Sequence, residues 1–291
     1  MTTDMHPTDA PDARATRKPV IGLMGEFSAG KSTLTNLLVG ARSLPVQVTA
    51  TQLPPVWLSH GTDAPVRIDL EGVEHPVNLE DAGHIDLDAT QHIRVHKDAD
   101  ILELCDLIDM PGISDPNMAA DVWQRMIHHA DIVLWCSHAT QAWRQSEAAV
   151  WLTMPHELYS KSLLLLTRMD RILSDRDKQR VIRRVEKETN GLFRSVLPVS
   201  LLQALEAGDD VEKWEASGAS GLSDALVDLV DEFTSKSTGR QVSRVRSRAL
   251  VGVEASLGED VTPAPRRMVM PTRVRPRPLS SRPLSAPTSR F

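Results

Sequence analysis

The sequence contains no long uninterrupted hydrophobic run, and its apolar stretches are short pieces such as residues 162–166. A helix that crosses a bilayer needs about 20 consecutive apolar residues, so we expect no transmembrane helix. Residues 1–18 carry Asp, Pro, His and Arg but no apolar segment of the kind found in secretory signals. Both absences favour a cytoplasmic location.

Cysteine is also scarce. Only Cys105 and Cys136 occur among 291 residues, and each lies within an apolar stretch. We therefore expect buried free thiols rather than a disulfide or a metal site. The remaining composition, 41% apolar and 25% charged, is ordinary for a globular core, and the length suits one large domain with extensions.

Charge is distributed unevenly along the chain. Residues 240–291 contain eleven Arg, no Lys and three acidic residues, a net charge of +8, whereas the whole chain carries −6, which leaves −14 for residues 1–239. From residue 261 onward there are also seven Pro among 31 residues. We therefore expect residues 239–291 to be a disordered basic tail with a partner of its own. An anionic membrane, an acidic protein or the chain's own acidic part would each suit its charge.

Hydrophobic periodicity predicts strands that alternate with helices. The expected strands are Val20–Met24, Val56–Ser59, Ile93–His96, Ile101–Ile108, Ile132–Cys136, Leu163–Thr167 and Val196–Ser200, with a hairpin over residues 65–79. The expected helices are Ser32–Val39, Asn117–His129, Glu147–Leu158, Asp175–Leu192 and Leu222–Lys236. This alternation predicts an α/β fold, with a mostly parallel sheet covered by helices on both faces and a ligand at the carboxyl ends of the strands.

The most specific motif follows the first expected strand. Residues 25–32 read Gly-Glu-Phe-Ser-Ala-Gly-Lys-Ser, which fits the phosphate-binding pattern G-x-x-x-x-G-K-[ST] between a strand and a helix. The backbone N–H groups of such a loop surround a polyphosphate, while Lys31 would reach the terminal phosphates and Ser32 would bind Mg²⁺. The nucleotide-contacting residues expected here are Gly25, Glu26, Phe27, Ser28, Ala29, Gly30, Lys31, Ser32 and Thr33.

Two other strand ends carry an acidic residue. In the run from Asp109 to Gly112, Asp-Met-Pro-Gly, we expect Asp109 to hold Mg²⁺ through water and the Gly112 N–H to sense a γ-phosphate. The later run Thr167-Arg168-Met169-Asp170 has the form of a guanine reader. One carboxylate can accept both the N1–H and the exocyclic amine of guanine, a donor pair that adenine lacks. Arg168 replaces the usual Lys of [NT]-K-x-D, and its stem would lie along the base.

A weaker signal is Ser200-Leu201, which follows the last expected strand where a loop behind guanine would fall. Leu201 stands where Ala is usual. The order of the four motifs is that of guanine-nucleotide-binding domains, so GTP or GDP and Mg²⁺ are the expected ligands.

These motifs resemble those of the bacterial dynamin-like GTPases. The resemblance covers roughly residues 19–236 and is most specific in the phosphate loop and the Thr-Leu-x-Asn-Leu-Leu that follows Ser32. Residues 130–135 and the phrase Gln145-Ser146-Glu147 support it. It implies a GTPase domain of the P-loop NTPase superfamily over residues 19–238, preceded by a disordered segment, residues 1–18.

The resemblance also implies roles for particular residues. In this family a Thr before a Pro completes the magnesium shell, and Thr51 fits best, with Thr49 in reserve. Ser28 matches the position that helps to place the catalytic water and a monovalent cation, so Ser28, Lys31 and Thr51 are the expected catalytic residues. Ile113 stands where small signalling GTPases carry the water-orienting Gln. The resemblance therefore implies slow turnover that is helped by dimerisation across the nucleotide face, by a cation or by a partner.

Dynamin-like proteins use long helical stalks, for which we expect no room here. A partner chain could supply the stalk, and membrane contact of this chain would be peripheral. Three alternative functions stay open. Eroded catalysis would make the chain a nucleotide-dependent interaction module. An Era-like, ribosome-associated GTPase would bind RNA through its Arg-rich tail, although the −14 charge of residues 1–239 opposes nucleic acid binding. An ATPase is disfavoured by Asp170.

Overall fold

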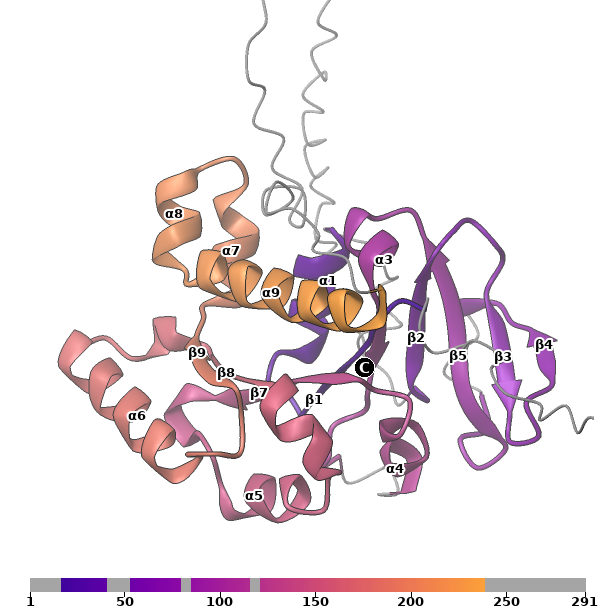
Figure 1. The fold of residues 1–291 in the computed structure, drawn as a ribbon, viewed down its shortest axis with the longest axis horizontal. Coiled ribbons are helices and arrows are strands. Elements are labelled where there is room, and N and C mark those ends of the chain that lie inside the picture. Colours follow the sequence, from indigo (N-terminus) through magenta and orange to yellow (C-terminus); the bar gives the residue numbers. More distant parts are fainter. Residues whose placement is uncertain (1–16, 41–52, 80–84, 116–120, 239–291) are drawn as a thin grey trace, which may run out of the picture. The chain divides into compact units, whose positions relative to one another are not determined.

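The computed structural model describes residues 17–40, 53–79, 85–115 and 121–238 (Figure 1). The described strands form one sheet of nine in the order β4-β3-β5-β2-β6-β1-β7-β8-β9. They are β1 (Val20–Gly25), β2 (Val56–His60), β3 (Val66–Asp69), β4 (Glu74–Pro76), β5 (Thr90–Lys97), β6 (Asp106–Asp109), β7 (Ile132–His138), β8 (Leu163–Thr167) and β9 (Ser195–Pro198).

Most neighbouring strands run parallel. β1 pairs in parallel with β6 and β7, and β7, β8 and β9 continue in the same direction. At the other end, β2 is antiparallel to β6 and parallel to β5, while β3 is antiparallel to both β4 and β5. The expected α/β fold with a mostly parallel sheet is confirmed, and so is the hairpin within residues 65–79.

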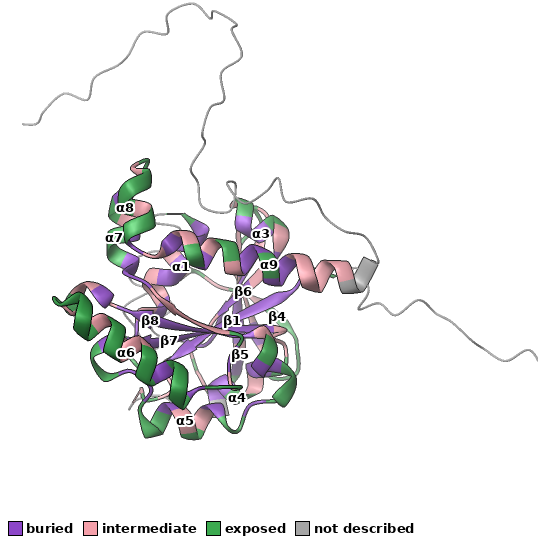
Figure 2. Ribbon diagram, turned by 60° about the vertical axis from the view of Figure 1, so that its left-hand side comes forward, coloured by how far each residue is buried: buried purple, intermediate pink, exposed green. Residues whose placement is uncertain are grey.

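Helices cover both faces of this sheet (Figures 1 and 2). The described helices are α1 (Lys31–Val39), α3 (Asp100–Leu104), α4 (Asp121–Ile127), α5 (Gln145–Trp151), α6 (Asp175–Glu188), α7 (Leu201–Ala207), α8 (Val211–Ala216) and α9 (Ala219–Thr238), with short 3-10 turns at Ala139–Gln141, His156–Lys161 and Met169–Arg171. One hydrophobic cluster joins the sheet to α1, α3, α7 and α9, and a second joins it to α4, α5 and α6.

Strand β8 shows how the sequence produces these two cores. Leu163 and Leu165 belong to the first cluster, whereas Leu164 and Leu166 belong to the second, and all four side chains are fully buried. Successive side chains of a strand point to opposite faces, so a strand between two helical layers reads as a continuous apolar run. Burial of each leucine contributes roughly 1.5–3 kcal/mol.

One predicted element is wrong. The expected strand Ile101–Ile108 is two elements, because Asp100–Leu104 forms α3 and only Asp106–Asp109 enters the sheet as β6. The N–H of Cys105 bonds back to the Ile101 carbonyl at 3.0 Å and ends the helix. A short apolar run is compatible with the period of a strand and with that of a helix. Here the packing of Ile101 and Leu102 within the first cluster stabilises a helix. Glu103 consequently lies in α3 and not on a strand.

Further boundaries differ at the C-terminal end of the domain. The expected helix Glu147–Leu158 is α5 followed by a separate 3-10 turn, and α7 and α8 were not predicted. β9 ends at Pro198, and the N–H of Val199 makes a last hydrogen bond to the Leu166 carbonyl of β8 at 2.9 Å. Ser200 therefore lies beyond the strand, at the N-terminal end of α7.

The structure also bears on the scarce residues. Cys105 and Cys136 are buried and free, as predicted, and burial raises the pKa of both thiols to about 12, so neither is a reactive thiolate.

Across the described parts of the chain, no helix is long and apolar enough to span a membrane. The predicted N-terminal segment, apart from Arg17 and Lys18, and the predicted basic tail lie outside the described residues.

A buried histidine gives the domain a pH-dependent stability. His92 on β5 is 4% exposed, packs 5.4 Å from the Trp57 ring, and neither of its ring nitrogens has a hydrogen-bond partner within the described residues. Burial, with Arg94 and His129, lowers its pKa from 6.5 to about 4. Protonation is therefore favoured in the unfolded chain between these two pH values.

We expect His92 to lower the free energy of unfolding as the pH falls from 6.5 towards 4. The decrease should be about 2 kcal/mol at pH 5 relative to neutral pH. Urea unfolding at a series of pH values should show a shallower acid decline for His92→Leu than for the wild type. His156→Gln, at an exposed position, is the control and should follow the wild type. Parallel declines of all three proteins would contradict the prediction.

Candidate functional site

The loop between β1 and α1, residues 25–30, lies close against the end of β7. A Cβ on Gly25 would stand 2.1 Å from the Cys136 carbonyl oxygen, and the residue has φ 138°, so no other residue fits without a shift. Ser28 has φ 59° and Gly30 φ 101°, which turns the chain into α1 at Lys31. Parallel pairing of β1 with β7 thus dictates where the loop begins.

The side chain of Lys31, the first residue of α1, lies against this loop. Its side chain is buried, and Nζ donates to the carbonyl oxygens of Gly25 at 3.1 Å and Glu26 at 2.8 Å. Burial lowers the pKa of Lys31, while the carboxylates of Asp109, Asp115 and Glu26 act in the opposite direction. Ser32 and Thr33 follow in the first turn of α1 and are partly exposed.

Asp109 ends β6 beside the loop, opposite Leu23 in the β1 ladder. Desolvation raises its pKa, whereas Lys31 and a hydrogen bond from Thr35 lower it. That hydrogen bond runs from Thr35 Oγ1 to Asp109 Oδ2 at 2.9 Å, and Thr35 is fully buried. Sequence reasoning missed Thr35, although its place one turn after Lys31 on the same helix face is the signal that would have found it.

The segment after Asp109 runs along the loop. A Cβ on Gly112 would come within 2.9 Å of the Phe27 backbone nitrogen, and the N–H of Ile113 donates to the Gly25 carbonyl at 3.2 Å. The N–H of Phe27 in turn donates to Ser114 Oγ at 3.1 Å. The Asp109 to Gly112 motif and the phosphate loop are therefore in direct contact, as their order in the sequence predicts.

The guanine-reader motif approaches the loop from the other side. Thr167 Oγ1 donates to the Ala29 carbonyl at 2.7 Å, and the Arg168 guanidinium donates to the Ser28 carbonyl at 2.8 Å. Arg168 adopts φ 56°, which turns the chain after β8. Asp170 Oδ2 lies 3.6 Å from Nε of Arg171, a neighbour that sequence reasoning did not single out.

A cavity of about 150 Å³ lies between the loop and this motif. Its lining residues are Gly30, Thr33, Thr167, Arg168, Asp170, Arg171, Leu201 and Leu202. Asp170 is the single carboxylate in that lining. Leu201 lines the cavity, whereas Ser200 is buried and its N–H donates to the Ser217 carbonyl at 2.8 Å. Thr51 and Thr49 lie outside the described residues, so their expected role stays a prediction.

Comparison with known proteins identifies the family. The model of the dynamin family matches residues 21–169, more than half of the chain. The chain belongs to the dynamin family. It is 25% identical over 219 residues to Dynamin-like protein 2 of Campylobacter jejuni, covering 72% of this chain and 34% of that protein. It is also 25% identical over 277 residues to a probable transmembrane GTPase, FZO-like, of Arabidopsis thaliana chloroplasts, covering 82% of this chain and 27% of that protein.

Solved structures agree on the fold. Two structures of an oligomerised bacterial dynamin pair superpose with TM-scores of 0.52 and 0.53 at 17% and 19% identity, covering 77% of this chain and 37% of each of those chains. The chain spans about a third of the length of the curated relatives it matches. The predicted dynamin-like GTPase domain is confirmed, and neither the eroded module nor the Era-like alternative is favoured.

Proposed function

We propose that this GTPase domain binds GTP between the loop of residues 25–32 and the cavity at Asp170, and that Lys31, Ser28 and Thr51 promote hydrolysis of its β–γ bond. The observation that carries the proposal is the convergence of three motifs on one loop. Lys31 is buried in it, Gly112 lies against Phe27, and Arg168 bonds to Ser28. Backbone N–H groups and one buried ammonium are suited to a polyphosphate.

Mg²⁺ fits the oxygen donors at the loop. Ser32 and Asp109, with Thr51 as the predicted third residue, are hydroxyl and carboxylate ligands of the kind that Mg²⁺ prefers. Thr35 Oγ1 donates to Asp109 Oδ2 at 2.9 Å and helps to hold that carboxylate in place. When bound, Mg²⁺ would neutralise part of the phosphate charge, with Ser32, Asp109 and Thr51 as the residues that would hold it.

Exchange of Lys31 tests the phosphate site. We expect Lys31→Ala to weaken GTP binding about 100-fold, because it removes charge-assisted bonds to the terminal phosphates. Calorimetric titration with GTP and Mg²⁺ measures the loss, and a melting curve shows that the variant is folded. Lys187→Ala, on the exposed part of α6, is the matched control. A folded Lys31→Ala protein with wild-type affinity would remove the proposal.

Asp170 is proposed to select guanine. It is the single carboxylate in the cavity lining, and Arg168 and Arg171 flank it. We expect Asp170→Asn to weaken GTP binding about 10- to 100-fold and to favour xanthosine triphosphate, because an amide cannot accept both guanine donors. Asp175→Asn, at an exposed carboxylate of α6, should leave the preference unchanged. Equal binding of ATP and GTP by the wild type would contradict the assignment.

We propose that turnover is slow in the isolated protomer and accelerates when two copies meet across the nucleotide face. Ile113 has no group that orients water, which leaves Ser28, with K⁺ as a proposed cofactor, for that task. Phe27 is 62% exposed in the loop and Leu202 is 55% exposed at the cavity, so apolar surface is available on this face.

We expect kcat per protomer at saturating GTP to rise with protein concentration and to be higher in K⁺ than in Na⁺. Leu202→Asp should remove the dependence on protein concentration, because it places a charge on the proposed contact. Leu152→Asp, at an apolar residue 61% exposed at the end of α5, should retain it. Turnover that is fast at every dilution and indifferent to the cation would argue against this mechanism.

Other parts of the family's activity remain proposals for this chain. The net charge of +8 in residues 240–291 suits an anionic membrane or an acidic protein. A partner chain that supplies a helical stalk is one such proposal. Peripheral attachment at the inner face of a membrane would then follow from the tail rather than from the described domain.

A further inference from the structure

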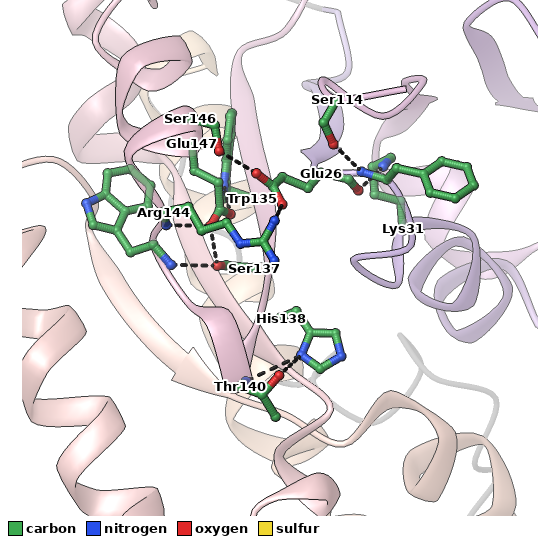
Figure 3. Close-up of polar contacts among 12 residues, drawn as sticks. Glu26, Lys31, Ser114, Trp135, Ser137, His138, Thr140, Arg144, Ser146 and Glu147 are labelled. Atoms are coloured by element: carbon green, nitrogen blue, oxygen red, sulfur yellow. Dashed lines mark hydrogen bonds and ion pairs between the residues drawn. The ribbon is translucent and has the colours of Figure 1, made fainter. Parts of the chain in front are cut away.

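A carboxylate projects from the phosphate loop itself. The side chain of Glu26, directly after Gly25, is only 15% exposed. Its Oε2 lies 3.1 Å from a guanidinium nitrogen of Arg144, and its Oε1 accepts a hydrogen bond from Ser146 Oγ at 2.5 Å (Figure 3). Arg144 is the last residue before α5 and Ser146 lies in the first turn of that helix, both more than a hundred residues away in the sequence.

That turn is held by a buried network. The Glu147 carboxylate, 2% exposed, accepts hydrogen bonds from the Arg144 backbone N–H at 2.9 Å, from Ser137 Oγ at 2.9 Å and from Trp135 Nε1 at 3.0 Å (Figure 3). Ser137 also accepts the N–H of Trp143 at 3.0 Å. Three donors on one buried carboxylate determine the course of the backbone at Arg144, so its side chain is presented to Glu26 by a rigid scaffold.

The charge of Glu26 is unfavourable for a phosphate site. Its own carbonyl oxygen accepts a hydrogen bond from Lys31 Nζ, the cation of the loop, and Asp109 and Asp115 also act on that ammonium. A triphosphate would add several negative charges beside three carboxylates, and like charges repel strongly where water is partly excluded. Two guanidinium groups reach the loop besides the Lys31 ammonium: Arg168 bonds to the Ser28 carbonyl, and Arg144 pairs with the Glu26 carboxylate itself. Arg144 is therefore the cation that offsets the charge of this carboxylate.

We propose that Arg144 is a positioning residue of the GTPase site, which neutralises and holds the Glu26 carboxylate so that the γ-phosphate can bind beside it. The inference rests on the proposed function, because it assumes that GTP occupies this loop. Arg144 acts through Glu26 and not by contact with the nucleotide. Its effect should therefore depend on the presence of the Glu26 carboxylate.

A double-mutant cycle tests this dependence. Wild type, Arg144→Gln, Glu26→Gln and the double variant are titrated with GTP and with GDP in Mg²⁺, at low and at high salt. We expect Arg144→Gln to weaken GTP binding about 10-fold and GDP binding less, because the γ-phosphate adds charge, and we expect high salt to reduce the loss. Adding Glu26→Gln to Arg144→Gln should restore GTP affinity to within about 2-fold of wild type.

Controls separate this role from a structural one. Arg144→Lys keeps the charge and should retain most of the affinity. Arg94→Gln breaks a surface pair with Glu74 on the distant β5 and β4 and should bind GTP as the wild type does. If Arg144→Gln does not fold, Glu26→Gln decides: because the carboxylate that Arg144 neutralises is then absent, this variant should bind GTP within about 2-fold of wild type, and clearly weaker binding would overturn the inference.

Other outcomes overturn it as well. Equal losses for GTP and GDP that Glu26→Gln does not rescue would assign Arg144 a purely structural role. An unrescued loss confined to GTP would mean that Arg144 contacts the phosphate directly. If Arg144→Gln binds GTP as tightly as the wild type while Lys31→Ala loses GTP affinity, the inference about Arg144 is wrong and the proposed function still holds. Absence of GTP binding by the wild type would remove both.

Discussion

Parallel pairing of β1 with β6 on one side and β7 on the other is the constraint on which the site depends. The register sets Leu23 opposite Asp109 and Gly25 opposite Cys136, so three strands end at nearly the same level. The phosphate loop, the Asp109 segment and the turn after β7 all begin there. Position 25 requires glycine, because the Cys136 carbonyl occupies the space that a side chain would need.

Three consecutive residues of the loop are tied to three different segments. Arg144 and Ser146 hold the Glu26 carboxylate, Ser114 accepts the Phe27 N–H, and Arg168 bonds to the Ser28 carbonyl. The loop is thus in contact with the segment after β6, with the start of α5 and with Arg168 after β8. A nucleotide that moves the loop would act on all three, which is a physical route from hydrolysis to rearrangement.

Much of the fold was predictable because the central strands obey simple rules. β1, β7 and β8 are buried on both faces and therefore read as unbroken apolar runs, and the loop after β1 carries a motif with a strict spacing. The error at residues 101–108 arose where an apolar run was too short to show a period. The short helices α7 and α8 were missed because they are only 7 and 6 residues long, and packing rather than local pattern stabilises such helices.

By itself the sequence determined the α/β class, the phosphate loop, the order of the nucleotide motifs and the family they resemble, because each rests on local spacing along the chain. Tertiary structure alone decided that Thr35 holds Asp109 and that Arg144 reaches Glu26 across more than a hundred residues. Arg144 is an ordinary exposed residue in a pattern-based reading. Its significance depends on strand register, since only the pairing of β7 with β1 brings the turn after one strand to the loop after the other.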